Sequence, residues 1–177
     1  MTEVLAFAGS NSSTSINYEL VKYTVSLMDN HKVQTLDMSR YPFPMYSADE
    51  EKKKGFSNSL IEFKGYIQQS QGLVLSVNEH NGNPSSYFKN LIDWLSRLER
   101  KFLEDTVVFL MAASTGKGGG KGSLGITDKI LPRFGAEVVS TFSLPSFNET
   151  FATGEITDVA LKEQHAAALQ VFLQKLN

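Results

Sequence analysis

A dense run of hydroxyl and amide side chains follows the first apolar stretch of the chain, Val4–Ala8. The run spans residues 9–17 and reads GSNSSTSIN. These side chains can donate hydrogen bonds to an anion. The backbone N–H groups at the start of a following helix point the same way, with the positive end of the helix dipole behind them. The loop therefore predicts a site for one phosphate group, with Ser10, Ser12, Ser15, Ile16 and Asn17 as its residues.

A plainer interpretation is that one serine or threonine here only caps the helix. Capping requires a single residue of this kind, whereas the loop contains several, and this density favours the phosphate interpretation. The loop lacks the spaced glycines of a dinucleotide-binding turn and the Gly-Lys-Ser/Thr of a P-loop. One phosphate, as in a mononucleotide, is the ligand that it suits.

Two further polar loops follow apolar runs. The run Leu73–Val77 continues into residues 78–82, which read NEHNG, and the run Val107–Ala112 continues into residues 114–120, which read STGKGGG. Glycines let a backbone approach a flat ring and offer N–H groups to it. We favour that function over a merely flexible surface loop. Glu79 and His80 are an acid/base pair in principle, but adjacent loop residues of this kind are usually solvated, and we assign them no acid/base role.

Five apolar runs alternate with five helical patterns. The predicted strands are Val4–Ala8, Val33–Leu36, Leu73–Val77, Val107–Ala112 and Val138–Phe142. The predicted helices are Ser15–Asp29, Ser57–Gln69, Ser85–Phe102, Lys121–Phe134 and Ile156–Leu176. The charged run 49–54 is expected to be a solvated helix start or loop, and His31 and His165 are expected to lie on the surface.

Alternation of strands and helices predicts right-handed βαβ units, a parallel sheet and a three-layer α/β/α sandwich. Five such strands fit the doubly wound order 2-1-3-4-5, in which the strand order reverses between the first and third strands. That reversal opens a crevice at the carboxyl ends of the strands. The three polar loops all leave carboxyl ends near this point. Residues 1–177 are expected to form a single domain.

Three loops in this order resemble the NADPH-dependent FMN reductase family, which includes flavin, quinone, azo-dye and chromate reductases. Its first loop typically reads Gly-Ser-x-Arg-x-x-Ser-x-Asn, matched here by Gly9, Ser10, Ser15 and Asn17. Its second reads Pro-Glu-Tyr-Asn-Gly, then Leu-Lys-Asn and Asp-Trp, matched at the same spacing by Glu79, Asn81, Gly82, Lys89, Asn90, Asp93 and Trp94. Its third is a Ser/Thr-then-glycine-rich segment, matched by residues 114–120. The resemblance covers nearly the whole chain.

The resemblance implies a flavodoxin-like fold, bound FMN and a hydride donor, NADPH or NADH. It implies reduction of flavin, quinone, azo or similar small acceptors. The cofactors carry this chemistry, so no catalytic side chain is required. The expected FMN-binding residues are Ser10, Ser12, Ser15, Ile16, Asn17, Asn78, Glu79, His80, Asn81, Gly82, Ser114, Thr115, Gly116, Gly118 and Gly119.

Three positions depart from the family pattern. The arginine of the first loop is Ser12 here, and Lys117 or Lys121 is a candidate replacement for its charge. The proline and tyrosine of the second loop are Asn78 and His80. Because the tyrosine position lies near the flavin, His80 is expected to alter the environment of the flavin or the choice of substrate.

The resemblance also implies a homodimer or tetramer. Exposed aromatic side chains are enriched at interfaces, so we expect Tyr87 and Trp94 near a subunit contact. The alternative is that both only pad the edge of the core.

Composition limits the alternatives. The chain is 41% hydrophobic and 20% charged, an ordinary globular balance, and its formal net charge of −2 offers no field for nucleic acid. It contains no cysteine, which excludes disulfides and thiolate chemistry. The first residues lack a basic segment and a long apolar run, so neither a signal peptide nor membrane insertion is expected and the cytoplasm is the default location.

Two other functions remain open. A flavodoxin-type electron carrier shares the fold, but such carriers are typically more acidic and their first loop has a Thr-x-Thr-Gly-like pattern. A flavin-free scaffold of the same fold is the second, and the missing arginine keeps it open.

Overall fold

The computed structural model describes residues 3–176 and confirms the doubly wound parallel sheet. Its five strands are β1 (Glu3–Ala8), β2 (Lys32–Leu36), β3 (Gly72–Ser76), β6 (Val107–Ala113) and β7 (Glu137–Leu144). They pair in the order β2-β1-β3-β6-β7, and every neighbouring pair is parallel. In the register, Phe7 of β1 lies between Leu36 of β2 and Leu75 of β3. This is the order 2-1-3-4-5 predicted from the sequence.

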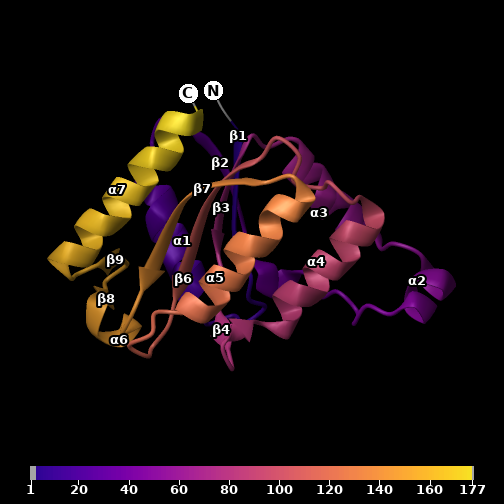
Figure 1. Cartoon of the computed structure of the whole chain (residues 1–177), viewed down its shortest axis with the longest axis horizontal. Helices are drawn as coiled ribbons and strands as arrows, with labels where there is room; N and C mark the ends of the chain where they lie inside the picture. Colours follow the sequence, from indigo (N-terminus) through magenta and orange to yellow (C-terminus); the bar gives the residue numbers. More distant parts are fainter. Residues whose placement is uncertain (1–2, 177) are drawn as a thin grey trace.

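Helices cover both faces of the sheet. The α-helices are α1 (Ile16–Ser26), α2 (Ala48–Lys54), α3 (Asn58–Gln68), α4 (Ser86–Leu98), α5 (Lys121–Ile130), α6 (Phe147–Thr150) and α7 (Val159–Leu176). One buried cluster joins the sheet to α3 and α4, and a second joins it to α1 and α7. Figure 1 shows α1 and α7 on one side of the strands and α3, α4 and α5 on the other. The molecule is a three-layer α/β/α sandwich.

Serine side chains begin most of the longer helices. Ser15, Ser57 and Ser85 each accept a hydrogen bond from the backbone N–H three residues later, as N-caps do. The helix starts predicted at these three serines are confirmed within one residue. The short helix α2 begins in the same way at Ser47, which accepts from the N–H of Glu50.

Two helices late in the chain have other bounds than the sequence predicted: α7 begins later and α5 ends earlier. The helix expected from Ile156 begins at Val159, because Ile156 belongs to a two-stranded hairpin, β8 (Phe151–Ala152) with β9 (Glu155–Ile156). The helix expected to reach Phe134 is α-helical only to Ile130 and ends as a 3₁₀ turn, η2 (Leu131–Phe134), which contains Pro132.

Two side chains expected near the surface lie inside. His165 is 0% exposed, in the cluster that α7 makes with the sheet. Trp94 is 3% exposed, and its Nε1 donates to the carbonyl of Pro44 at 2.8 Å. Tyr87 is partly buried, and its hydroxyl lies within hydrogen-bond distance of the carbonyls of Met38 and Tyr41. These contacts support the core-edge interpretation for both aromatic residues.

Candidate functional site

A crevice of about 260 Å³ lies at the carboxyl ends of β1, β3 and β6. It sits at the point where the strand order reverses, which is where ligands bind in open α/β sheets. Its lining comes from all three polar loops: Ser10, Ser12, Thr14, Ser15, Ile16, Asn17, Asn78, Glu79, His80, Ala113, Ser114 and Thr115.

Ten of the predicted site residues line this crevice and five do not. The five outside the lining are Asn81, Gly82, Gly116, Gly118 and Gly119. Thr14 and Ala113 line the crevice but were not predicted. Thr14 belonged to the polar run and could have been included, whereas Ala113 contributes a position at a strand end that its residue type does not signal.

The first loop winds tightly and caps its helix. The Ser15 hydroxyl oxygen accepts from the N–H of Tyr18, and the Ser10 hydroxyl oxygen accepts from the N–H of Ser12. Both hydroxyl protons are left to donate elsewhere. The N–H groups of Ile16 and Asn17 have no acceptor within α1, as at every helix start. Capping and anion binding are therefore compatible in this loop.

Gly9 is the first residue of this loop, and its missing side chain makes room for α4. A Cβ at Gly9 would lie 2.8 Å from the ring of Phe88 in α4. The Gly9 carbonyl accepts from the Ser85 hydroxyl, and its N–H donates to the carbonyl of Ser76. The glycine lets the first loop pack closely on the start of α4.

The amide of Asn17 spans the ends of two strands. Its oxygen accepts from the Ser76 hydroxyl at 2.7 Å and from the N–H of Ala113 at 2.8 Å, while its nitrogen donates to the carbonyl of Ala113 at 3.1 Å. Asn17 is 2% exposed. Only one of its amide protons remains for a ligand. The sequence suggested a phosphate donor, and the structure adds a tie between α1, β3 and β6.

The second loop forms a small hairpin, β4 (Glu79–His80) with β5 (Asn83–Pro84). Asn81 and Gly82 at its tip have φ angles of 53° and 74°, which suit the Asn-Gly turn of a tight hairpin. At the base of the hairpin, the amide nitrogen of Asn78 lies 3.1 Å from Nε2 of His80.

One polar atom in this loop has no protein partner. The Asn78 side-chain oxygen is buried and makes no hydrogen bond to any residue in the described range 3–176. Turning the amide over would place its N–H₂ group there instead, so either orientation leaves a buried polar atom unpaired. Asn78 lines the crevice. A buried polar atom of this kind indicates a missing hydrogen-bond partner.

The glycines of the third loop pack against the neighbouring strands. Gly119 and Gly120 have φ angles of 63° and 74°. A Cβ would lie 2.2 Å from the Ser143 hydroxyl at Gly119 and 2.9 Å from Ala112 at Gly120. The side of Gly119 that would carry a Cβ faces β7, and the expected approach of its backbone to a flat ring stays a prediction. A Cβ added at Gly118 would have no other atom within 4 Å.

Two lysines lie in the third loop and directly after it, at the start of α5. Lys117 and Lys121 are exposed, and neither forms an ion pair within the described part of the chain. Among residues 3–176 there is no group of three or more His, Cys, Asp or Glu side chains placed to hold a metal ion.

Sequence comparison identifies the family. The model of the NADPH-dependent FMN reductase family matches residues 2–149. The chain belongs to the NADPH-dependent FMN reductase family. FMN is the cofactor of this family, and NAD(P)H is its electron donor. A quinone reductase of Escherichia coli is 35% identical over 77 residues, which span 44% of this chain and 41% of that protein. The match thus covers less than half of this relative.

Solved structures share the whole fold at low identity. FerB of Paracoccus denitrificans, a flavoenzyme NAD(P)H:(acceptor) oxidoreductase, has a TM-score of 0.76 at 20% identity, and the match covers 98% of each chain. An NADH:FMN oxidoreductase in its apo form has a TM-score of 0.78 at 16% identity, over 100% of this chain and 91% of its own. An azoreductase from Bacillus anthracis has a TM-score of 0.64 at 17% identity, over 100% and 99%. These likenesses establish the flavodoxin-like architecture predicted for this family member.

Proposed function

We propose that this member of the NADPH-dependent FMN reductase family binds FMN in the crevice and uses it to pass hydride from NAD(P)H to a small acceptor such as a quinone, flavin or azo compound. The observation that carries the proposal is the crevice itself. It lies at the strand reversal, is lined by the start of α1, and is lined by Asn78, whose side-chain oxygen is buried without a partner.

The residues present fit FMN. The start of α1 supplies unpaired N–H groups and the positive end of a helix dipole, which suit a phosphate. Ser10, Ser12 and Ser15 contribute hydroxyl groups to the lining of the crevice. The exposed Lys117 and Lys121, which lie outside this lining, are the candidates to replace the charge of the family arginine. The flavin ring system has N–H and carbonyl groups along one edge, and Asn78, which lines the crevice, has one buried amide atom without a partner. When bound, FMN supplies the hydride-accepting ring.

The chain's own residues bind and orient. The second loop contributes Asn78, Glu79 and His80 to one wall of the crevice, and the third contributes Ser114 and Thr115 to another. We propose that Asn81, Gly82, Gly116, Gly118 and Gly119 shape these loops and do not contact the phosphate. No side chain is required as an acid or base, because hydride transfer depends on alignment of the two cofactors and exclusion of water.

FMN should bind in preference to FAD, because the first loop suits one phosphate and has no second pyrophosphate loop beside it. Titration of the purified protein with FMN and FAD, followed by flavin fluorescence, tests this. We expect tighter binding of FMN. Equal or tighter binding of FAD would contradict the single-phosphate site.

The reductase activity is tested by anaerobic mixing of the FMN-loaded protein with NADPH and, separately, NADH. We expect at least one of them to bleach the flavin absorption, and a quinone added afterwards to restore it. A flavin that binds but is not bleached by either donor would favour the electron carrier. Failure to bind flavin would favour the scaffold.

Two further proposals come from the sequence. The first is a homodimer or tetramer, and the second is a cytoplasmic location. Within residues 3–176, no helix combines the length and the apolar character needed to cross a membrane.

A further inference from the structure

The helix α5 begins without a capping side chain of its own. Its N-cap residue is Gly120, with a φ of 74°, and no side chain at that position can accept a hydrogen bond. The N–H of Ser123, in the first turn, donates instead to Oε2 of Glu79 at 2.8 Å. A carboxylate from the β4–β5 hairpin therefore caps a helix that lies more than forty residues further along the chain. Negative charge is favoured at this end of a helix.

A second contact joins the same two segments. The Ser123 hydroxyl donates to the carbonyl of Asn78 at 2.9 Å, and Ser123 is 0% exposed. A Cβ at Gly122 would lie 2.7 Å from Oε2 of Glu79 and 2.9 Å from the carbonyl of Gly82. The hairpin thus packs on the backbone of α5 at a distance that only glycine permits.

The hairpin is short, and α5 is the helix on which both of its strands pack. Each of its strands has two residues, and an isolated two-stranded hairpin is marginal in water. The residues on either side of Glu79 are Asn78 and His80, both of which line the crevice. Their position relative to β1 and β6 depends on how firmly the hairpin is anchored.

We propose that Glu79 is a positioning residue for the flavin site. Its carboxylate anchors the hairpin to the start of α5, so that Asn78, with its unpaired side-chain oxygen, and the ring of His80 are held at the crevice before the cofactor binds. Gly122 makes room for this contact and Ser123 completes it. The inference rests on the proposed FMN site and deepens it, because it assigns to Glu79 a task other than acid/base chemistry.

Glu79→Ala and Glu79→Gln test the proposal together. Alanine removes the cap, while glutamine keeps an oxygen that can accept from the N–H of Ser123. Loss of a helix cap corresponds to about a five- to tenfold change in an equilibrium. We expect Glu79→Ala to weaken FMN and riboflavin by this same factor, because the phosphate loop is untouched. Glutamine should restore most of the affinity.

Amide hydrogen exchange of the apo-protein gives a measurement that does not depend on the flavin. In Glu79→Ala the amides of residues 78–84 should exchange faster than in the wild type, and in Glu79→Gln they should stay close to it. Gly122→Ala reaches the same contact from the helix side and should also speed exchange in the hairpin. It keeps the test open should Glu79→Ala fail to fold.

Asp158→Ala is the matched control. Asp158 caps α7 through a 2.9 Å hydrogen bond from the N–H of Leu161, and it does not line the crevice. Its removal should lower stability in a comparable way and leave flavin affinity unchanged. Unchanged hairpin exchange in both Glu79→Ala and Gly122→Ala would overturn the proposal. So would a Glu79→Gln variant that binds flavin as poorly as alanine with its hairpin still protected. If the wild type binds no flavin, the proposed function fails while the exchange data still decide whether Glu79 anchors the hairpin.

Discussion

Asn17 can serve as a phosphate donor or as a structural tie between α1 and the strand ends, and the sequence alone could not distinguish these two roles. In Asn17→Ala the N–H of Ala113 and the hydroxyl of Ser76 lose a buried partner. We expect the free energy of unfolding to fall by about 2–4 kcal/mol, because a buried polar group left unpaired costs about 1–3 kcal/mol. FMN and riboflavin should weaken by the same factor. Urea unfolding and titration with both flavins measure this; a loss confined to FMN would show that Asn17 acts mainly on the phosphate.

Ser15 carries a different expectation, because its oxygen caps α1 while its proton remains available. Ser15→Ala should cost about 1 kcal/mol of stability through the lost cap. It should also weaken FMN about tenfold more than riboflavin, since a hydrogen bond to a charged group contributes about 1.5–3 kcal/mol. Ser13→Ala, at an exposed neighbouring position outside the crevice lining, is the control and should change neither quantity. Equal weakening of both flavins would leave Ser15 as a cap only.

His165 makes the stability of the fold depend on pH. The Thr24 hydroxyl oxygen lies 2.8 Å from the carbonyl oxygen of Leu20 and 2.9 Å from Nε2 of His165, and the buried Nδ1 of His165 has no partner in the described range. Burial lowers the pKa of His165 to about 4. In the unfolded chain a histidine has a pKa of about 6.5, so between these values the unfolded state binds more protons and stability rises with pH.

We therefore expect the wild type to lose up to about 3 kcal/mol of unfolding free energy between pH 7 and pH 4 from this residue alone. His165→Gln cannot take up the proton and should show a shallower slope across that interval. Urea unfolding of both proteins at half-unit steps of pH gives the comparison. Parallel curves for the two proteins would contradict the assignment.

For single residues, the sequence predicted the position of those in dense polar loops. It missed the position of residues whose contacts come from distant parts of the chain. Ser10 to Asn17 follow a buried strand, so their place in the crevice could be expected. The partners of Asn17 at Ser76 and Ala113 are brought to it only by the sheet. A single histidine in the amphipathic helix α7 gives no sign of which face it occupies, and so His165 was placed on the surface.

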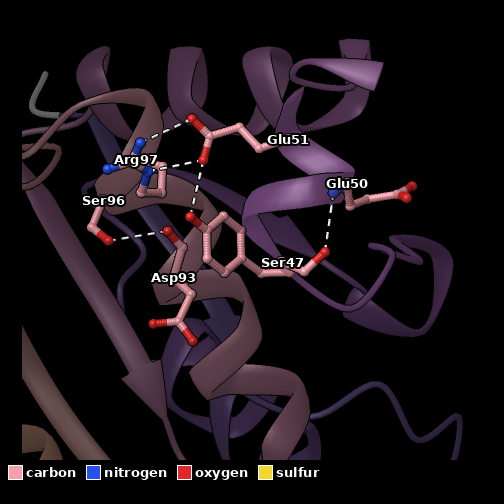
Figure 2. A network of polar contacts seen from close by, with 7 residues as sticks. Ser47, Glu50, Glu51, Asp93, Ser96 and Arg97 are labelled. Carbon is pink, nitrogen blue, oxygen red and sulfur yellow. Dashed lines mark hydrogen bonds and ion pairs between the residues drawn. The ribbon is translucent and has the colours of Figure 1, made fainter. Parts of the chain in front are cut away.

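Among the elements, α2 contributes no buried residue and depends on one polar contact with α4. Figure 2 shows Glu51 receiving hydrogen bonds from Arg97 and from a tyrosine hydroxyl, that of Tyr46. The hydrogen bond from Arg97 lowers the pKa of the Glu51 carboxyl. The helix also borders an apolar cavity of about 150 Å³ whose walls include Phe43, Leu60 and Trp94.

Glu51→Gln should therefore release α2 without unfolding the rest of the chain. We expect faster amide exchange over residues 47–54 and an almost unchanged free energy of unfolding, because little apolar surface holds this helix. Glu50→Gln is the control. Glu50 pairs with Lys54 inside the same helix, so this variant should leave exchange at the contact with α4 unchanged. Equal effects of the two substitutions would mean that the helix is held by its backbone alone.

The sequence predicted the long elements well and the short ones poorly. Short runs rich in Val, Leu and Phe identified all five strands of the sheet, three of them as continuous apolar runs. The serine caps marked three helix starts. The hairpins β4–β5 and β8–β9 have two-residue strands, too short for any periodicity to show. Within α7, Val159 is 71% exposed, and the buried residues are His165, Leu169 and Phe172.

For the whole molecule, the strand order could be predicted from the alternation of strands and helices and the right-handedness of βαβ units. Subunit assembly could not be predicted in this way. Tyr87 and Trp94 are satisfied within one chain, so they no longer argue for an interface. We still expect a homodimer or tetramer on the ground of the family resemblance. Sedimentation at micromolar concentration should give a multiple of 19.6 kDa, with the emission of the single tryptophan independent of dilution because Trp94 is buried. A species of 19.6 kDa would contradict the assembly.

The two ends of the described chain meet beside the same strand. The carbonyl of Glu3 accepts from the N–H of Gln71, and the side chain of Leu176 packs where Gly72 has no Cβ. Figure 1 shows both ends of the described chain at the amino ends of the strands, opposite the β4 hairpin. A protein tethered to a bead or an electrode through either end would thus turn its crevice toward the solution. Joining the ends and opening the chain at a surface loop away from the crevice should also be tolerated.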